Sequence, residues 1–413
     1  MRVGARDDMS NKQQQDMVFV SLEAWDEVWR RNQFLVTGFL KTGLARRVLW
    51  VEPPRNFALW LVGRLRGNKE SFRRGRIEPI RDAKGAFRFS PLQPLPNTYA
   101  PLRWVNERVE RWSLKAAMRR MKMQSPLLWI NNHWAGPIVG HLGESALIYD
   151  ITDDWLVWER APSRRERLLR LDTFLCKRAD ATIVCSPQLL ERKQGLASHL
   201  YLVPNGVDAK HYARVGDPNF ALHPIAAKWQ HPVLGYLGTV HPDRVDVDMV
   251  VELARALPNA TIALVGPNML PDEKRAQLEV LPNIVLTGAV AYADVPAFLT
   301  AFDVALVPHV ETSFTQSLNP IKLGEYLAAG LPIVSTRVAG FVEVADQYPD
   351  LVRAVSGNSH FIRACEEALA EGNPSAKRDA HRTLAHSMSW DGHVAHIRDI
   401  IGGIKERRKS SVG

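Results

Sequence analysis

Residues 303–336 read DVALVPHVETSFTQSLNPIKLGEYLAAGLPIVST and carry the clearest structural pattern of the chain. The apolar run 304–307 is typical of a buried strand in a parallel sheet. A helix is predicted next, with Asn319 as its N-cap and Pro320 at its first position, where the missing N–H costs nothing. Gly330 is predicted to end this helix. The stretch therefore predicts a strand–loop–helix unit of an α/β domain.

This predicted helix start is suited to phosphate, because its free N–H groups and its dipole attract anions. Lys322 lies in the first turn, where a cation opposes the dipole, and a bound diphosphate would explain it. Glu325 follows three residues later on the same face, where a carboxylate can hold ribose hydroxyls. An ordinary amphipathic helix with a surface Lys and a surface Glu is the equally weighted alternative.

A longer pattern around these residues resembles the nucleotide-sugar signature of glycosyltransferase family 4 and its neighbours, which have the GT-B fold. The pattern is Pro320-x-Lys322-x-x-Glu325-Tyr326-Leu327-Ala328-x-Gly330-x-Pro332. The resemblance implies that Lys322 contacts the donor diphosphate and that Glu325 contacts the ribose. Asn319, at the start of the same helix, is a further donor-binding candidate. Many retaining members carry a Glu eight residues before the second one, and this chain has Ser317 there, so the stereochemistry stays open.

Length and composition describe an ordinary globular protein. The chain has 413 residues, with 46% hydrophobic and 23% charged residues, and its length favours two domains. Its three cysteines are scattered without metal-ligand spacing, which is typical of a reducing cytosolic compartment. The first residues lack the apolar core of a signal peptide, and no apolar run is long enough to cross a bilayer.

Positive charge is concentrated in one region. Residues 55–122 contain seventeen Lys/Arg and five Asp/Glu, whereas the whole chain has a net charge of +9. A local excess of this size indicates an anionic partner for that region. Residues 103–122 predict a long helix, with Val105, Val109, Trp112 and Ala116 on its apolar side. The helix either packs on the sheet or contacts anionic lipid, and packing is the commoner fate.

The resemblance implies an α/β protein with two Rossmann-like domains that face a central cleft. The expected division is a disordered tail (1–16), an N-terminal acceptor domain (17–208), a linker (209–230), a C-terminal nucleotide-sugar domain (231–388), and a C-terminal helix that crosses back to the first domain with a basic tail (389–413).

The N-terminal region resembles bacterial teichuronic-acid and xanthan-type sugar transferases. The resemblance rests on Trp25-Asp26, on Arg31-x-Gln33, and on a strand that ends in Glu52-Pro53. It implies that Arg31 faces a phosphate or an anionic sugar, whereas the residues alone also allow a surface Arg.

Acidic residues follow a predicted strand at 146–149. In inverting members of this group, an acidic residue of the N-terminal domain is the base that deprotonates the acceptor hydroxyl. Asp153 and Asp154 are the candidates, with His133 as the third. Helix capping is the alternative role for the Asp pair, and a structural role is the alternative for His133.

The first loop of the second domain follows a strand at 233–237. A Gly after a strand lets the backbone approach a phosphate, and the resemblance implies that this loop lies near the donor phosphates. Gly238, Thr239 and Arg244 are therefore donor-binding candidates. Asp246-x-Asp248 matches a metal pattern on paper, but i,i+2 side chains diverge at a helix start. No metal and no further cofactor are expected.

The resemblance implies a hexosyltransferase-type enzyme that moves a sugar from a nucleotide-diphospho-sugar to a glycan or lipid-linked acceptor in envelope or exopolysaccharide biosynthesis. An epimerase or hydrolase of the same fold, or a nucleotide-sugar-binding scaffold, is the alternative. The expected location is cytoplasmic, at the inner face of the membrane, with peripheral contact to anionic lipid. No nucleic-acid partner is expected, because no binding motif accompanies the charge.

Overall fold

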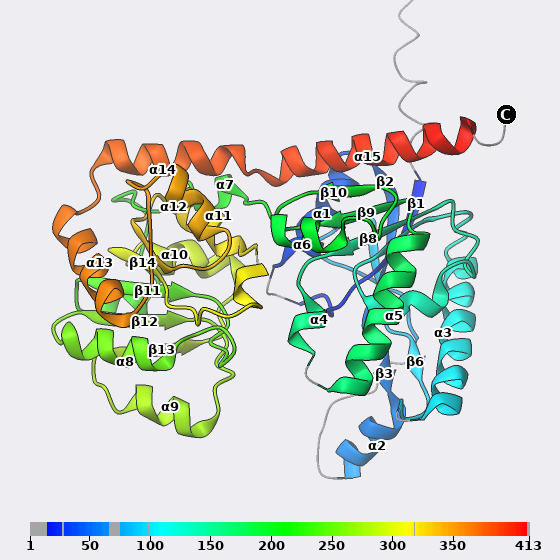
Figure 1. Ribbon diagram of the computed structural model, residues 1–413, viewed down its shortest axis with the longest axis horizontal. Coiled ribbons are helices and arrows are strands. Elements are labelled where there is room, and N and C mark those ends of the chain that lie inside the picture. The colour runs from blue at the N-terminus through cyan, green and yellow to red at the C-terminus, as the bar shows by residue number, and fades with distance from the viewer. Residues whose placement is uncertain are drawn as a thin grey trace, which may run out of the picture. The chain divides into compact units, whose positions relative to one another are not determined.

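The computed structural model describes residues 15–26, 29–65, 75–97, 99–159, 161–317 and 319–410. Their contacts divide into two units. The first unit contains the described residues within 15–26, Asn32–Val203 and 394–410. The second unit contains the described residues within 29–31 and Pro204–His393. Each unit is an α/β domain with helices packed on a sheet (Figure 1).

The first unit is built on an eight-stranded sheet with the order β10-β9-β8-β7-β1-β2-β5-β4, and all of its pairs are parallel except β4 with β5. The strands of this region are β1 (Gln15–Val20), β2 (Ala45–Val51), β3 (Arg55–Asn56), β4 (Glu78–Pro79), β5 (Ala86–Phe89), β6 (Leu92–Gln93), β7 (Leu127–Ile130), β8 (Ala146–Ile151), β9 (Ala181–Val184) and β10 (Leu200–Leu202). The helices are α1 (Arg31–Lys41), α2 (Phe57–Leu65), α3 (Ala100–Arg120), α4 (Trp155–Trp158), α5 (Pro162–Arg178) and α6 (Pro187–Lys193), with a 3-10 turn at His133–Ile138.

The second unit contains a six-stranded parallel sheet with the order β13-β12-β11-β14-β15-β16. Its strands are β11 (Val233–Leu237), β12 (Thr261–Val265), β13 (Ile284–Gly288), β14 (Val304–Val307), β15 (Ile333–Thr336) and β16 (Val352–Val355). Its helices are α7 (Ala209–Tyr212), α8 (Val247–Ala256), α9 (Asp272–Glu279), α10 (Val295–Leu299), α11 (Ile321–Ala329), α12 (Phe341–Gln347), α13 (Asn358–Glu371) and α14 (Ser375–Ser387). The last helix, α15 (Trp390–Ser410), belongs to the first unit from Val394 onward.

Both sheets are buried on their two faces, as their continuous apolar strands require. In the second unit, α8 and α13 pack on one face, while α7, α10, α11 and α14 pack on the other. In the first unit, α3, α5 and α6 share one core with the sheet. On the other face of this sheet, Phe39 of α1 contacts Trp129 of β7, with ring centroids 5.2 Å apart.

Strand β1 starts earlier than the sequence predicts. It begins at Gln15, within the expected tail, and residues 1–14 lie outside the described part of the chain. Asp16 extends the strand because its buried carboxylate forms ion pairs with Arg46 at 2.9 Å and with Arg47 at 2.6 Å. A polar residue at a strand start gave no sequence signal for this pairing.

Two further expectations differ from the structure. Residues 209–230, expected as a linker, pack into the second unit, because Tyr212 and Trp229 are buried in its core. Helix α3 does form and packs on the sheet, but Leu114 and Met118 are on its buried side. Trp112, predicted to be on the apolar side, is 69% exposed.

None of the helices in the described segments combines the length and the apolar character that a transmembrane helix needs.

Strand β11 depends on a glycine at its centre. A Cβ atom on Gly235 would lie 2.1 Å from the Phe302 ring. We therefore predict that Gly235→Ala lowers the free energy of unfolding by about 1–3 kcal/mol, the usual cost of an overpacked core. Gly402→Ala in α15 is the control, because nothing lies within 4 Å of the added Cβ. Chemical denaturation of the two variants measures the difference, and equal stabilities would contradict this account of the core.

Candidate functional site

The second sheet has a topological switch point between β11 and β14. From β11 the chain continues outward to β12 and β13, whereas β14 lies on the other side of β11 and is followed by β15. In open parallel sheets, ligands bind beyond the carboxyl ends of the strands at such a point. Gly238 follows β11, and Lys322 lies in α11, the helix that follows β14. The fold therefore brings together two segments that are about eighty residues apart in the sequence.

Helix α11 begins one residue later than predicted. Pro320 is the N-cap in an extended conformation, and no side chain caps this end. The side chain of Asn319, the predicted cap, instead accepts a hydrogen bond from the backbone N of Asn205 at 2.7 Å. The helix ends as predicted, at Gly330 with a φ of 72°. The uncapped N–H groups of the first turn remain able to bind an anion.

Lys322 is held by an aromatic residue rather than by an acid. Its Nζ donates a hydrogen bond to the Oη of Tyr236 at 2.9 Å and lies 4.4 Å from the centre of the same ring. In the described part of the chain, Lys322 forms no ion pair. Burial, and then the charge of Arg244, lower the pKa of Lys322 to about 7. A buried basic group that forms no ion pair in the described part of the chain therefore lies at the helix start.

Gly238 allows the loop to come close to this lysine. A Cβ atom there would lie 3.0 Å from Lys322 Nζ, and the φ of 136° disfavours any residue with a side chain. The next loop is equally close, because a Cβ on Gly266 would meet the carbonyl O of Gly238 at 2.3 Å. Thr239 accepts the Tyr236 hydroxyl hydrogen through its backbone O at 3.1 Å.

Two more basic side chains line this region. Arg244 follows the loop after β11, and its guanidinium lies 5.8 Å from the centre of the Phe314 ring. His309 follows β14 and is buried, with Nε2 3.4 Å from Tyr236 Oη. Burial and the charges of Lys322 and Arg244 hold the pKa of His309 well below its usual value, so this ring is neutral.

Glu325 lies one turn after Lys322 and accepts a hydrogen bond from Tyr212 Oη at 2.8 Å. Burial raises the pKa of Glu325, although this hydrogen bond opposes the shift. Tyr292 lies near the same carboxylate and stacks on His211, with ring centroids 4.0 Å apart. The arrangement offers one carboxylate and a set of aromatic surfaces beside the lysine.

Arg31 is buried rather than exposed to a ligand. Its guanidinium donates to the backbone O of Pro204 at 3.0 Å and to Asn205 Oδ1 at 3.2 Å. Asn205 in turn binds Asn319 through its backbone N and its side-chain amide. Arg31 therefore fixes the segment that leads to α11, which is a different role from the predicted contact with phosphate.

Two sequence features have structural roles here. Ser317, at the position where many retaining members have Glu, is buried and donates its hydroxyl hydrogen to the backbone O of Phe314 at 2.8 Å. Asp246, from the Asp-x-Asp pattern, is the N-cap of α8 and accepts from the N–H of Met249 at 3.0 Å.

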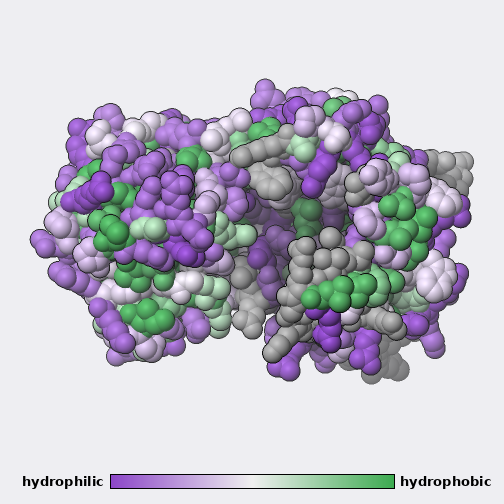
Figure 2. Space-filling model, turned by 90° about the horizontal axis from the view of Figure 1, so that it is seen from below, coloured by the Kyte–Doolittle hydropathy of each residue, from purple (hydrophilic) through white to green (hydrophobic). Residues whose placement is uncertain are grey.

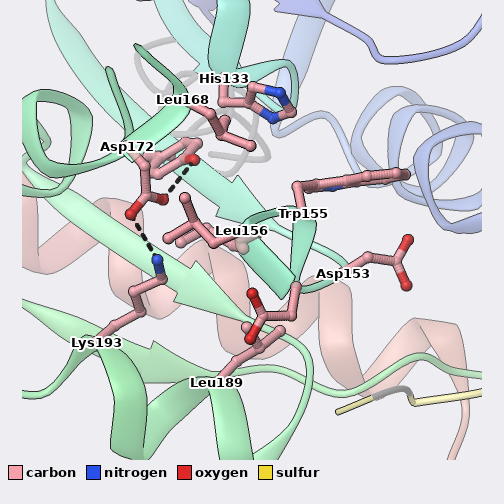
Figure 3. Close-up of a pocket in the computed structure, with 11 residues that line it drawn as sticks. His133, Asp153, Trp155, Leu156, Leu168, Asp172, Leu189 and Lys193 are labelled. Carbon is pink, nitrogen blue, oxygen red and sulfur yellow. Dashed lines mark hydrogen bonds and ion pairs between the residues drawn. The ribbon is translucent and has the colours of Figure 1, made fainter. Parts of the chain in front are cut away.

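The predicted catalytic residues lie together in the first unit, around a small pocket at the carboxyl ends of its strands (Figure 3). His133, Asp153 and Asp154 all line this pocket, with Trp155 beside them. Beneath them is a buried polar chain, in which Tyr149 Oη donates to Asp172 at 2.9 Å and Lys193 Nζ pairs with the same carboxylate at 2.6 Å. A buried pair of this kind fixes the pocket floor.

The structure separates the roles of the three candidates. Asp154 is the N-cap of α4 and also pairs with Arg192. Burial and the charges of Lys193 and Arg164 lower the pKa of His133 to about 3, so this ring is a weak base. Figure 3 shows the Asp153 carboxylate directed away from Lys193 and Asp172. Asp153 therefore differs from Asp154, whose carboxylate caps a helix.

Sequence reasoning did not find Tyr236, Tyr212, His309 or Asn205. Tyr236 lies inside an ordinary apolar strand, and its role depends on its hydrogen bond with Lys322, which is distant in sequence. Asn205 lies in a Pro-Asn-Gly turn, and its role depends on its hydrogen bonds to Arg31 and Asn319.

Known proteins share the fold of this chain and part of its sequence. The two sheets with Rossmann-type strand orders define a GT-B fold, and residues 231–371 match the family described as Glycosyl transferases group 1. The chain as a whole has the GT-B fold, and its residues 231–371 are similar to this glycosyltransferase family.

A relative from Bacillus subtilis (strain 168), named as a teichuronic acid biosynthesis glycosyltransferase, TuaH, is 28% identical over 259 residues. The match covers 59% of this chain and 64% of the relative, so it spans a little under two thirds of that protein.

Solved structures share the fold across most of the chain. Sucrose-phosphate synthase from Thermosynechococcus elongatus has a TM-score of 0.67 at 16% identity and covers 97% of this chain and 100% of its own. Anabaena HepE, solved with UDP-glucose, has a TM-score of 0.65 at 14% identity, with 94% and 99% covered. WaaG, a glycosyltransferase involved in lipopolysaccharide biosynthesis, has a TM-score of 0.61 at 14% identity, with 94% and 100% covered.

Proposed function

We propose that this protein transfers a sugar, of the hexosyl type, from a nucleotide-diphospho-sugar to a glycan or lipid-linked acceptor in envelope polysaccharide biosynthesis. The observation that carries the proposal is Lys322, a buried basic side chain at a helix start that forms no ion pair in the described part of the chain. A diphosphate supplies the missing negative charge. The match of residues 231–371 to a glycosyltransferase family supports the same conclusion.

Each donor group has a role in this proposal. Lys322, Arg244 and the first-turn N–H groups of α11 stabilise the negative charge that develops on the departing diphosphate. Gly238 and Thr239 form the loop that approaches the phosphates. Glu325 accepts hydrogen bonds from the ribose hydroxyls, and Tyr212 fixes its orientation. Because basic side chains and a helix dipole supply the positive charge, the proposal requires no metal ion.

The acceptor side of the proposal assigns the base to Asp153. A base must reach the proton of the acceptor hydroxyl and must be ionised at neutral pH. Asp154 already caps α4 and pairs with Arg192, and the pKa of His133, about 3, makes it a weak base. Transfer with inversion follows from a single base of this kind, and Ser317 provides no carboxylate for the position that many retaining members use.

Membrane contact is proposed for α3, the long helix of the basic region. Positions 104, 108, 112, 115 and 119 are spaced at i, i+4, i+8, i+11 and i+15, which places them on one face. All five residues are exposed, with Trp104 at 54% and Trp112 at 69%; the other three are Arg108, Lys115 and Arg119. Trp with Lys and Arg on one exposed face suits a surface of anionic lipid.

Helix α2 adds apolar side chains to the surface of the same unit. Phe57, Leu61 and Leu65 are 37%, 44% and 81% exposed, and α2 forms part of the surface seen in Figure 2. These side chains support the proposed membrane contact. We further propose that the enzyme works in the cytoplasm at the inner face of the membrane, where a lipid-linked acceptor would be present.

Nucleotide binding tests the donor site. We predict that UDP, GDP, ADP or dTDP raises the melting temperature, because a ligand that binds the native state stabilises it. Lys322→Ala should weaken binding of the best nucleotide roughly tenfold to a hundredfold, the loss expected for a charged hydrogen bond. Lys228→Ala, at an exposed lysine of the same unit, is the control. Unchanged affinity in Lys322→Ala would remove the phosphate assignment.

The two aspartates should behave differently. We predict that Asp153→Asn lowers kcat by about 10²-fold or more, because it removes the general base. Asp154→Ala should lower the free energy of unfolding by about 1 kcal/mol through the lost cap. Nucleotide release with acceptor and thermal denaturation measure the two effects. Full activity of Asp153→Asn would exclude Asp153 as the base.

Lipid binding tests the proposed membrane surface. We predict that the protein sediments with vesicles of phosphatidylglycerol and phosphatidylcholine more strongly than with phosphatidylcholine alone. The double variant Lys115→Gln, Arg119→Gln should weaken this binding roughly thirtyfold, at about 1 kcal/mol for each basic residue. Lys228→Gln serves as the control for surface charge. Binding that is equal for both vesicle types, or unaffected by the double variant, would contradict the proposal.

A further inference from the structure

The Lys322 amine is contacted by a neutral side chain and forms no ion pair in the described part of the chain. Tyr236 on β11 accepts its hydrogen bond at 2.9 Å and places its ring 4.4 Å from Nζ, and both contacts come from a neutral side chain. Tyr236 is fully buried and donates its own hydrogen to the backbone O of Thr239 at 3.1 Å. The phenol therefore has a fixed direction, with a lone pair aimed at the lysine.

Charged and titratable groups face Lys322 from each neighbouring element. Arg244, after β11, repels its positive charge, and Glu325, on α11 itself, attracts it. His309, after β14, is neutral, because burial and both cations hold its pKa well below the usual value. The carboxylate of Glu325 is already bound to Tyr212 at 2.8 Å. In the ligand-free protein, these groups therefore stabilise the ammonium form of Lys322 only weakly.

We propose that Tyr236 is a positioning residue that holds the Lys322 amine against the donor site, and that binding of a nucleoside diphosphate makes this amine take up one proton from solution. The inference rests on the proposed donor site and adds a specific residue and a proton to it. The balance is simple: the neutral amine and one solvent proton become an ammonium that pairs with the diphosphate, and no covalent bond changes.

The direction of the pH effect follows from linkage. In the free protein the pKa of Lys322 is about 7, and the negative charge of the diphosphate raises it in the complex. A group whose pKa is higher in the bound state contributes its full binding energy below the free pKa. This contribution is lost as the pH rises above about 7. Affinity should therefore fall with increasing pH, and proton uptake should be largest above neutrality.

Titration calorimetry measures the proton directly. UDP, or whichever of GDP, ADP and dTDP binds more tightly, is titrated into the full chain at about pH 8, roughly one unit above the free pKa, in Tris and in HEPES. These buffers differ in ionisation enthalpy, so the difference in observed heat counts the protons. We expect uptake approaching one proton for each nucleotide. UDP-glucose, whose phosphates do not titrate in this range, is the second ligand.

Three variants separate the parts of the inference. Lys322→Arg carries a permanent charge, and we expect it to bind nucleotide without proton uptake. Tyr236→Phe keeps the ring but loses the hydroxyl, so the pH at which affinity begins to fall should move down by roughly one unit. Tyr326→Phe is the matched control. It removes a buried hydroxyl that accepts from the N–H of Leu237 at 2.7 Å, and it should leave the pH profile unchanged.

The outcomes distinguish the inference from the proposed function. Nucleotide binding with no proton uptake in the wild-type protein would overturn the inference and leave the donor site standing. A pH profile that is the same in Tyr236→Phe and the wild type would remove the role of Tyr236. Absence of binding by every nucleotide would contradict the donor site itself. Should Tyr236→Phe fail to fold, the comparison of wild type with Lys322→Arg still decides the proton uptake.

Discussion

The proposed donor site depends on Lys322, a buried lysine that forms no ion pair in the described part of the chain. Lys322 lies at the start of α11, where the helix dipole opposes it, and its hydrogen-bond acceptor is the phenol of Tyr236. Such a cation lowers the stability of the ligand-free protein and favours the binding of an anion. Burial lowers the pKa of the Lys322 amine, and the same burial strengthens the attraction between its ammonium form and a phosphate. These properties suit an anion-binding site.

Several neighbouring residues allow Lys322 and the start of α11 to adopt these positions. Gly238 has no side chain because a Cβ would approach Lys322 Nζ within 3.0 Å. Asn319 and Asn205 bind one another and fix the segment that leads into α11, and Arg31 in turn holds Asn205. In the first unit, the buried Asp172–Lys193 pair supports a separate pocket, in which Asp153 is the carboxylate proposed as the base.

The sequence predicted the fold class well, because its strand–helix alternation and the signature around Lys322 are local patterns. The end of α11 at Gly330 was correct, whereas its start and the beginning of β1 were each wrong by one or two residues. Asp16 belongs to a strand only because Arg46 and Arg47 pair with it, and no local pattern shows that. The prediction that Trp112 lies on the apolar side of α3 was wrong, because Leu114 and Met118 are the side chains that pack against the sheet. Tyr236 and Asn205 were not found, because their meaning comes from residues distant in sequence.

A crystal structure of the protein with UDP, or with whichever nucleoside diphosphate binds best, tests the central claim most directly. The account predicts the diphosphate within about 3 Å of Lys322 Nζ and of the first N–H groups of α11, beside Gly238, with the ribose hydroxyls on Glu325. A nucleotide bound elsewhere, or one that leaves Lys322 on Tyr236 without touching phosphate, would contradict it.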